Sequence, residues 1–120
     1  MPSHCRVLLV EDEPLVGLDL AALLEDEGAT IVGVAQSVAA AWGCLGKSEM
    51  NCALLDINLR GETSFAIADA LAEAGVPFAF VTACMDSVVP RRYRDIPIIR
   101  KPFITSVVLE VVTAVVGREA

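Results

Sequence analysis

The sequence predicts an α/β fold in which a doubly wound, five-stranded parallel sheet carries helices on both faces. Five short apolar runs alternate with segments whose apolar residues recur at helical spacing. This alternation is typical of strand–helix–strand units, whose right-handed crossovers produce a parallel sheet. The chain has 120 residues and a hydrophobic content of 55%, which fits one domain over residues 1–120 with a proper core.

The first half of the chain supplies three predicted strands and two predicted helices. The strands are rich in β-branched and aliphatic residues and cover residues 5–10, 30–35 and 52–56. A helix over 14–27 is expected because Pro14 suits a first helical turn and Gly28 suits a helix end. Ser37 can cap a second helix, which runs to about residue 47.

The second half repeats the pattern after a loop through residues 60–62. Thr63 or Ser64 can cap a third helix, and Gly75 closes it. A fourth strand covers 77–81 and a fifth covers 96–100, where Pro97 favours the edge of the sheet. Between them, Pro90 limits any helix in residues 85–95 to a turn or two. The last helix is expected over about 103–116.

Composition narrows the class of protein and its compartment. The net charge of −7 argues against a nucleic-acid-binding surface, which needs clustered cations. Cys5, Cys44 and Cys52 lie in apolar runs without any C-x-x-C spacing, so they are interpreted as small core residues of a reducing compartment. No run has the length of a membrane span and no signal peptide is visible, so we expect a cytoplasmic protein.

Five chemically matched residues follow the ends of four predicted strands: Glu11, Asp12, Asp56, Thr82 and Lys101. Because the carboxyl ends of parallel strands meet at one edge of a sheet, we expect these side chains to converge there. Three carboxylates held close together repel one another, and a hard divalent cation such as Mg²⁺ resolves the repulsion.

The same residues suggest a chemistry for the site. Asp56 ends a strand that is buried on both faces, and it can act as a carboxylate nucleophile that forms an acyl phosphate. Lys101 and Thr82 can bind phosphoryl oxygens while negative charge develops. The single histidine, His4, lies at the far N-terminus, so the phosphoryl donor must come from another molecule.

With these residues, the sequence resembles the receiver domain of two-component response regulators. The resemblance covers the whole chain, and its motifs are Leu9-Val10-Glu11-Asp12-Glu13-Pro14, Leu54-Leu55-Asp56-Ile57-Asn58-Leu59, Phe80-Val81-Thr82-Ala83 and Arg100-Lys101-Pro102-Phe103. It implies a flavodoxin-like (βα)5 fold with the strand order 2-1-3-4-5. It also implies a signalling domain rather than an enzyme, apart from catalysis of its own phosphorylation and dephosphorylation.

The resemblance assigns roles to the residues around the expected phosphoacceptor, Asp56. Asp12 coordinates Mg²⁺ directly, Glu11 acts through water, and the backbone carbonyl of Asn58 is a further ligand. A histidine kinase or a phosphotransfer protein supplies the phosphoryl group.

Further residues acquire roles through the same resemblance. Thr82 becomes the switch hydroxyl and Lys101 the phosphate-binding lysine, with a cis bond between Lys101 and Pro102. By their positions, Asn58 and Cys84 are expected to influence the lifetime of the phosphoryl group.

The sequence departs from the family pattern at positions that affect the switching mechanism rather than the phosphorylation chemistry. Receivers usually carry an aromatic switch residue three positions before the lysine, and here that position is Ile98. The segments over residues 56–62 and 77–82 are similar to those of a subgroup of stand-alone receivers, which typically carry Phe-Ala-Thr-Gly around the threonine, whereas this chain has Phe80-Val81-Thr82-Ala83. No output domain is expected in this chain, and both a stand-alone regulator and a domain of a larger protein remain open.

The last helix predicts a docking surface beside its core face. The expected core stripe is Ile104, Val107, Val108, Val111 and Val115. A second apolar line, Leu109, Val112 and Val116, would then be free for a homodimer or an effector. The output face would combine the segment over 85–95, the fifth strand and this helix.

Two other functions fit these residues less well. A phosphatase with an aspartyl nucleophile typically needs an acid two residues later, where this chain has Asn58. An unphosphorylated pseudo-receiver, a pure interaction module, should lack one of the acids, Thr82 or Lys101, and all of them are present.

Overall fold

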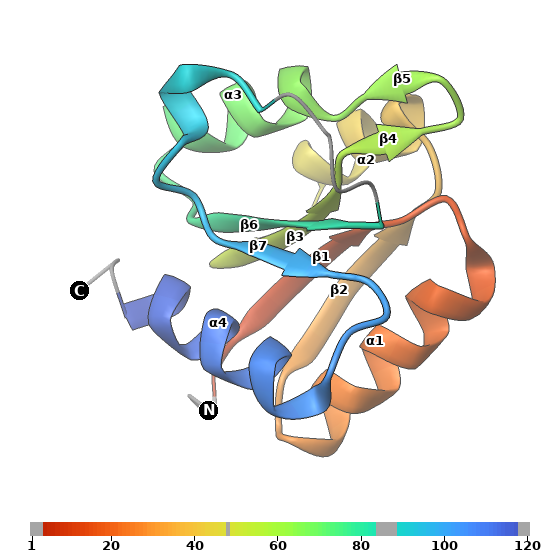
Figure 1. Ribbon diagram of the computed structural model, residues 1–120, viewed down its shortest axis with the longest axis vertical. Coiled ribbons are helices and arrows are strands. Elements are labelled where there is room, and N and C mark those ends of the chain that lie inside the picture. The colour runs from red at the N-terminus through yellow and green to blue at the C-terminus, as the bar shows by residue number, and fades with distance from the viewer. Residues whose placement is uncertain (1–3, 48, 84–88, 118–120) are drawn as a thin grey trace.

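The computed structural model describes residues 4–47, 49–83 and 89–117. Its centre is a five-stranded parallel sheet in the order β2-β1-β3-β6-β7 (Figure 1). The strands are β1 (Arg6–Val10), β2 (Thr30–Ala35), β3 (Cys52–Asp56), β6 (Phe78–Thr82) and β7 (Ile98–Arg100). In the order of the long strands along the chain this is 2-1-3-4-5, so the predicted flavodoxin-like sheet is confirmed.

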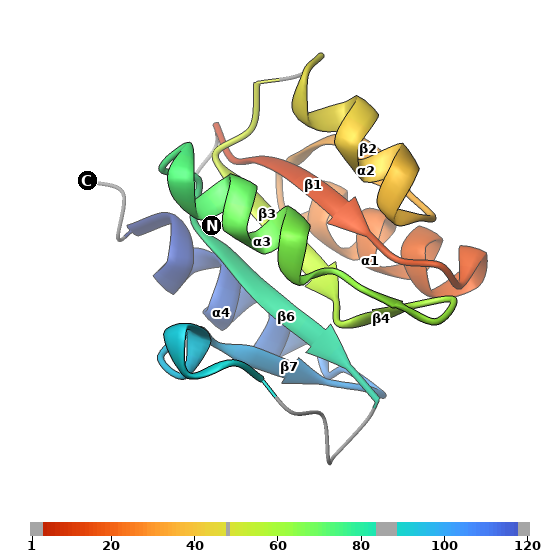
Figure 2. The same ribbon diagram turned by 90° about the horizontal axis from the view of Figure 1, so that it is seen from above.

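Four α-helices cover the two faces of this sheet. Helices α1 (Pro14–Asp26) and α4 (Thr105–Gly117) lie on one face, and α2 (Val38–Leu45) and α3 (Phe65–Glu73) lie on the other (Figures 1 and 2). Every residue of β3 and β6 is buried, as expected for strands covered on both faces. The prediction of a doubly wound α/β fold is therefore confirmed.

Local signals explain where the helices begin and end. Pro14 is the first residue of α1, and the Ser37 hydroxyl accepts a hydrogen bond from the backbone N–H of Ala40 at the start of α2 (3.1 Å). Ser64 stands at the N-cap of α3, but its side chain makes no cap hydrogen bond. Gly75, just after α3, has a φ of +76°, which favours glycine.

Two short elements were not predicted. Residues expected as a loop form an antiparallel hairpin of β4 (Asn58–Leu59) and β5 (Glu62–Thr63). The 3₁₀-helix η1 (Arg91–Tyr93) begins directly after Pro90, within the limit that this proline sets. Strand β7 starts at Ile98, two residues later than expected.

The predicted core stripe of the last helix is confirmed at Val108 and Val115 but is wrong at Ile104 and Val107. Val112 is fully buried and Val116 nearly so, and with Val108 and Val115 they form the face of α4 that packs on the sheet. Two residues of the expected core stripe are instead exposed, Ile104 by 64% and Val107 by 40%. A docking line through Val112 and Val116 is thereby excluded, because both side chains belong to the core.

The helices of the described chain are short. The longest, α1 and α4, have 13 residues each, whereas a helix that crosses a bilayer needs about 20. None of the helices within residues 4–47, 49–83 and 89–117 has both the length and the apolar character of a membrane span.

Candidate functional site

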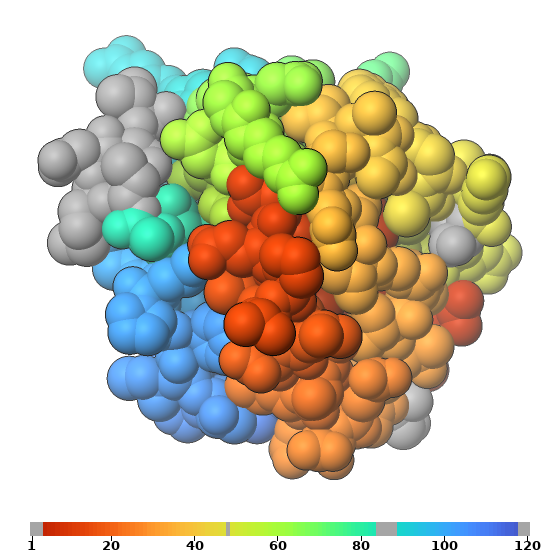
Figure 3. All heavy atoms as spheres, turned by 90° about the vertical axis from the view of Figure 1, so that its right-hand side faces the viewer, coloured from red at the N-terminus to blue at the C-terminus, as the bar shows by residue number. Residues whose placement is uncertain are grey.

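The polar residues that follow the strands meet around one cavity at the carboxyl edge of the sheet. The cavity has a volume of about 210 Å³ and is lined by Asp12, Glu13, Asp56, Asn58, Thr82, Ala83 and Lys101. Figure 3 looks onto this edge, where the red and orange atoms that follow β1 lie between the green hairpin and the blue atoms that follow β7. The convergence expected from the parallel topology is therefore present in the structure.

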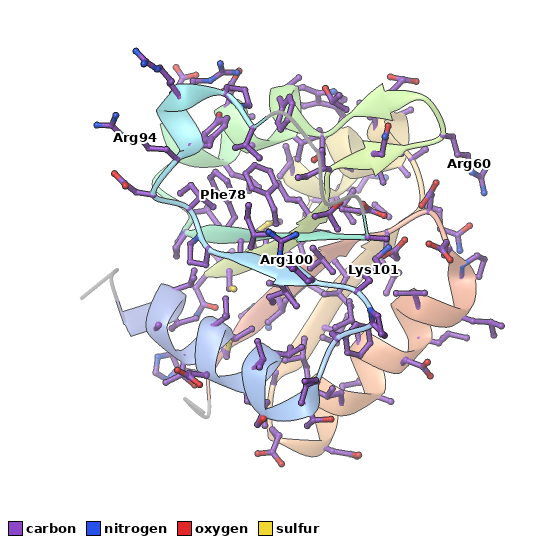
Figure 4. All side chains as sticks on the ribbon, in the orientation of Figure 1. Arg60, Phe78, Arg94, Arg100 and Lys101 are labelled. Carbon is purple, nitrogen blue, oxygen red and sulfur yellow. The ribbon has the colours of Figure 1, made fainter. Side chains whose placement is uncertain are left out.

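Lys101 provides the positive charge at this site and is only 10% exposed. Its Nζ lies 2.7 Å from Glu11 Oε1 and 2.9 Å from Asp56 Oδ2, and 3.4 Å from Glu13 Oε1. Figure 4 shows Lys101 at the end of β7, on the side where β1 also ends. The backbone holds this lysine in place, because its N–H donates to the carbonyl of Thr82 (2.9 Å).

Among the residues that the structure describes, four carboxylates gather near the Lys101 ammonium group. Glu11, Asp12, Glu13 and Asp56 each offer an oxygen, and these oxygens all lie within 4.8 Å of one another. Glu13 was not predicted to belong to this group. The run of three consecutive acids was the signal that could have included it.

Burial and charge shift two pKa values at this site in a consistent way. Burial raises the pKa of Glu11 to about 7, and the neighbouring Asp56 adds to the rise, although the Lys101 ammonium and the Glu13 backbone N–H oppose it. Burial alone would lower the pKa of Lys101, but the carboxylates of Glu11 and Asp56 outweigh it and raise that pKa. Lys101 therefore stays charged, while Glu11 can hold a proton near neutrality.

The β4–β5 hairpin lies against the acidic residues and helps to fix them. The Arg60 backbone N–H donates to Asp12 Oδ2 (3.1 Å), and the Asn58 N–H donates to Asp56 Oδ1 (3.3 Å). Arg60 and Gly61 have φ values of +53° and +90°, so both central residues of this tight turn are left-handed. The Arg60 side chain points away from the molecule (Figure 4).

The remaining predicted site residues lie in different parts of the structure, and not all of them line the cavity. Thr82 is buried and lines the cavity, and the Lys101–Pro102 bond is cis, as the resemblance implies. Ile98 lies on the edge strand β7 with 38% of its surface exposed. Cys84 lies outside the described residues. His4 precedes β1, at the opposite edge of the sheet from Asp56.

The donor set fits a hard divalent cation. Carboxylate oxygens and a backbone carbonyl are the ligands that Mg²⁺ prefers, and four carboxylates share one ammonium here. Asp12, Asp56, the Asn58 carbonyl and Glu11 are the groups that would hold it.

Comparison with known proteins identifies the family. The sequence matches the response regulator receiver domain over residues 7–112. The curated phyllosphere-induced regulator PhyR of Methylorubrum extorquens is 37% identical over 81 residues, which make up 65% of this chain and 30% of PhyR. The chain thus spans about a third of the length of that relative.

Solved structures agree with this assignment. The solution structure of SdrG from Sphingomonas melonis Fr1 is 39% identical, has a TM-score of 0.84, and matches over 96% of this chain and 98% of SdrG. The response regulator PhyR from Brucella abortus is 26% identical with a TM-score of 0.82, over 97% of this chain and 49% of PhyR. The chain belongs to the response regulator receiver domain family, a family of signalling domains rather than classical enzymes.

Proposed function

We propose that this chain receives a phosphoryl group on Asp56 and passes the resulting change to a partner protein. The observation that carries this proposal is the convergence of an aspartate, two further carboxylates, a hydroxyl and a lysine around one cavity, with the Glu11 carboxylate 2.7 Å from that lysine. For any one of these residues a surface or capping role would suffice. A set drawn from four strand ends is better explained by chemistry on a shared ligand.

Asp56 has the environment of a carboxylate nucleophile. One of its oxygens accepts a hydrogen bond from the Asn58 backbone and the other from Lys101, so the side chain is held in one orientation. An oxygen of Asp56 attacks the phosphorus of the donor, the bond from phosphorus to the leaving group breaks, and an acyl phosphate forms. Lys101 and Thr82 then donate hydrogen bonds to phosphoryl oxygens.

The acidic residues of the site supply the place for a metal ion. Mg²⁺, when bound, would offset the negative charge of the incoming phosphoryl group as it approaches the carboxylates. Asp12, oriented by the Arg60 backbone, and Asp56 itself would be its direct carboxylate ligands, and Glu11 would act through water. Glu13 adds a fourth carboxylate at the rim, close to the metal ligands.

The phosphoryl donor is proposed to be a histidine kinase or a phosphotransfer protein. The chain's own histidine lies at the other edge of the sheet, and receiver domains interact with kinases or effectors. The two PhyR proteins named above are regulators, which supports an output through contact with another protein.

Intact-mass spectrometry after incubation with acetyl phosphate and Mg²⁺ tests this proposal. The unmodified chain should gain the mass of one phosphoryl group, and the gain should vanish at alkaline pH, where acyl phosphates hydrolyse. Asp56→Asn should show no gain, because the amide is not a nucleophile.

Asp95→Asn provides the matched control. Asp95 is an exposed aspartate outside the cavity, so its replacement removes the same charge and should leave the phosphoryl gain unchanged. Full labelling of the Asp56→Asn protein would contradict the proposal.

A further inference from the structure

A second cavity lies at the opposite edge of the sheet from the acidic site. It has a volume of about 620 Å³ and is bordered by α2 and α3, the two helices that share one face of the sheet (Figure 2). Its lining includes Met50, which precedes β3, and Val76, which precedes β6, so it lies at the amino edge of the sheet. Asp56 ends β3 at the carboxyl edge, so the two sites are separate. We call this second site the α2–α3 cavity.

The lining of the α2–α3 cavity is mostly apolar and carries one aromatic ring. Leu45, Met50 and Leu71 supply aliphatic surface, and Trp42, the chain's only tryptophan, borders the cavity with 47% of its surface exposed. Helix α2 has no charged residue, although one side of it faces solvent. A cavity of this volume with an apolar lining and few polar groups is typical of the places where proteins bind small molecules. The lining therefore suits a ligand with an apolar body.

The charge at the α2–α3 cavity is negative. Both helices end there, because Leu45 and Gly46 line it at the end of α2 and Ala74 lines it at the end of α3. Neither helix has a basic residue in its last turn, so the partial negative charge of both carboxyl ends is not offset within the helices. Glu49 adds a full carboxylate to the lining, whereas the neighbouring Lys47 is exposed and does not line the cavity. The cavity should therefore attract a cation.

Hydrogen bonds to the start of β1 hold residues 49–51 in place. Arg6 Nε donates to the backbone carbonyl of Glu49 (2.9 Å), and the Arg6 backbone N–H donates to Asn51 Oδ1 (2.7 Å). Asn51 Nδ2 donates in turn to the carbonyl of His4 (3.0 Å). Arg6 thus binds the backbone of Glu49, and the Glu49 carboxylate forms no ion pair with any residue that the structure describes. The backbone that carries this carboxylate is fixed while its charge stays available to a ligand.

We propose that the α2–α3 cavity binds a small amphipathic cation, an organic molecule with an apolar body and one ammonium group. The body packs on Leu45, Met50 and Leu71, while the ammonium group lies against the face of the Trp42 ring and near the Glu49 carboxylate. The volume of the cavity matches a small molecule rather than a helix of a partner protein, which needs an extended groove. This inference goes beyond the proposed function and does not depend on phosphoryl transfer to Asp56.

The fluorescence of Trp42, the sole tryptophan, measures binding without a label. The probe is 4-phenylbutylammonium, and 4-phenylbutanol and 4-phenylbutyrate are its neutral and anionic analogues of nearly the same size. The titrations contain millimolar Mg²⁺, which screens the acidic residues around Lys101 from the probe. The ammonium compound should change the fluorescence and bind at least about fivefold more tightly than the alcohol, because the aromatic ring and the carboxylate both favour a cation. The butyrate should bind most weakly of the three.

Three variants locate the probe on the molecule. Glu49→Gln should weaken binding of the ammonium compound by about twofold to fivefold, because an exposed ion pair is lost, and should leave the affinity for the alcohol unchanged. Ala74→Leu should weaken binding of both compounds by more than about tenfold, because the larger side chain occupies the cavity. Ala74 is exposed at the end of α3, so this variant should fold. Glu25→Gln is the matched control, since it removes the same charge from α1 on the other face of the sheet, and its affinity should not change.

Each unfavourable outcome overturns the inference on its own. Equal affinities for the ammonium compound and the alcohol would mean that the cavity does not select a cation. Unchanged binding to Ala74→Leu would mean that the probe binds elsewhere on the molecule. A fluorescence that none of the three compounds changes, with no heat of binding in calorimetry, would mean that the cavity binds no such ligand. Phosphorylation of Asp56 is measured separately by intact mass, so failure here leaves the proposed function untouched.

Discussion

Glu11 should make the metal-free protein less stable as the pH rises from about 4.5 to about 7. Its carboxyl group is 2% exposed and shares the Lys101 ammonium with Asp56 and Glu13, so one cation cannot balance the acids around it. Burial raises the pKa of Glu11 from 4.5 to about 7. Glu11→Gln replaces the group with a neutral one of similar shape and removes this titration.

The sign and size of the effect follow from the two pKa values. A carboxyl group whose pKa is higher in the folded protein favours folding below its unfolded pKa, and this contribution is lost as the pH rises through the folded value. The shift of the Glu11 pKa from 4.5 to about 7 corresponds to about 3 to 4 kcal/mol, at about 1.4 kcal/mol for each pKa unit. The loss should occur between about pH 4.5 and about pH 7, that is, between the unfolded and the folded pKa.

Urea unfolding in the presence of a chelator, followed by circular dichroism, measures this effect. The free energy of unfolding of the unmodified protein should fall across the window, and that of Glu11→Gln should fall less, so that the variant is the more stable protein at the alkaline end. Glu25→Gln, which removes an exposed glutamate of α1, should follow the unmodified protein. Millimolar Mg²⁺ should restore the unmodified protein at alkaline pH, because the ion binds the ionised carboxylates.

Parallel curves for the unmodified protein and Glu11→Gln would refute the reasoning, since they would mean that Glu11 ionises in the folded state as it does in the unfolded chain. A variant less stable than the unmodified protein at the alkaline end would refute it as well, because the Glu11–Lys101 ion pair would then outweigh the cost of burial.

Two further predictions concern Lys101 and the last helix. Lys101→Ala should retain Mg²⁺ binding in calorimetry. The rate of phosphate incorporation should fall at least about tenfold, because the missing charge acts on the phosphoryl group. Loss of metal binding would mean that the role of Lys101 is misassigned. Val112→Ala should lower the free energy of unfolding by about 2 kcal/mol, because a core cavity forms, whereas Ile104→Ala should change it by less than about 0.5 kcal/mol. The reverse ranking in urea unfolding would restore the predicted core stripe of α4.

The topology of the sheet could be predicted from the sequence because it depends on patterns that are local. Each strand is a short apolar run, and each crossover is a segment with helical spacing. Once the sheet is parallel, its carboxyl ends share one edge. Residues as far apart as Asp12, Asp56 and Lys101 could therefore be placed together without knowledge of any long-range contact.

The orientation of α4 could not be predicted in the same way. This helix is apolar on most of its circumference, so the sequence offers several possible core faces, and the packing on the sheet selects the one that contains Val108 and Val112. The β4–β5 hairpin on either side of the expected loop was missed for another reason. Its strands have two residues each, too few for an alternating pattern to appear.

The contact between Tyr93 and Asp69 could not be predicted from the sequence. The two residues are 24 positions apart, and no local pattern predicts that η1 packs beside α3. The absence of an aromatic residue at Ile98 was visible in the sequence. The place where an aromatic ring does pack against β6 became visible only in the structure.

Chemical mapping of the modified residue tests the central claim most directly. Borohydride reduces an aspartyl phosphate to homoserine, which peptide mass spectrometry locates after treatment of the phosphorylated chain. We predict homoserine at position 56, and only in samples that received both the phosphodonor and Mg²⁺. Homoserine at position 12 would contradict the assignment of Asp56 as the phosphoacceptor. Phosphate incorporation without any homoserine at position 56 would contradict it as well.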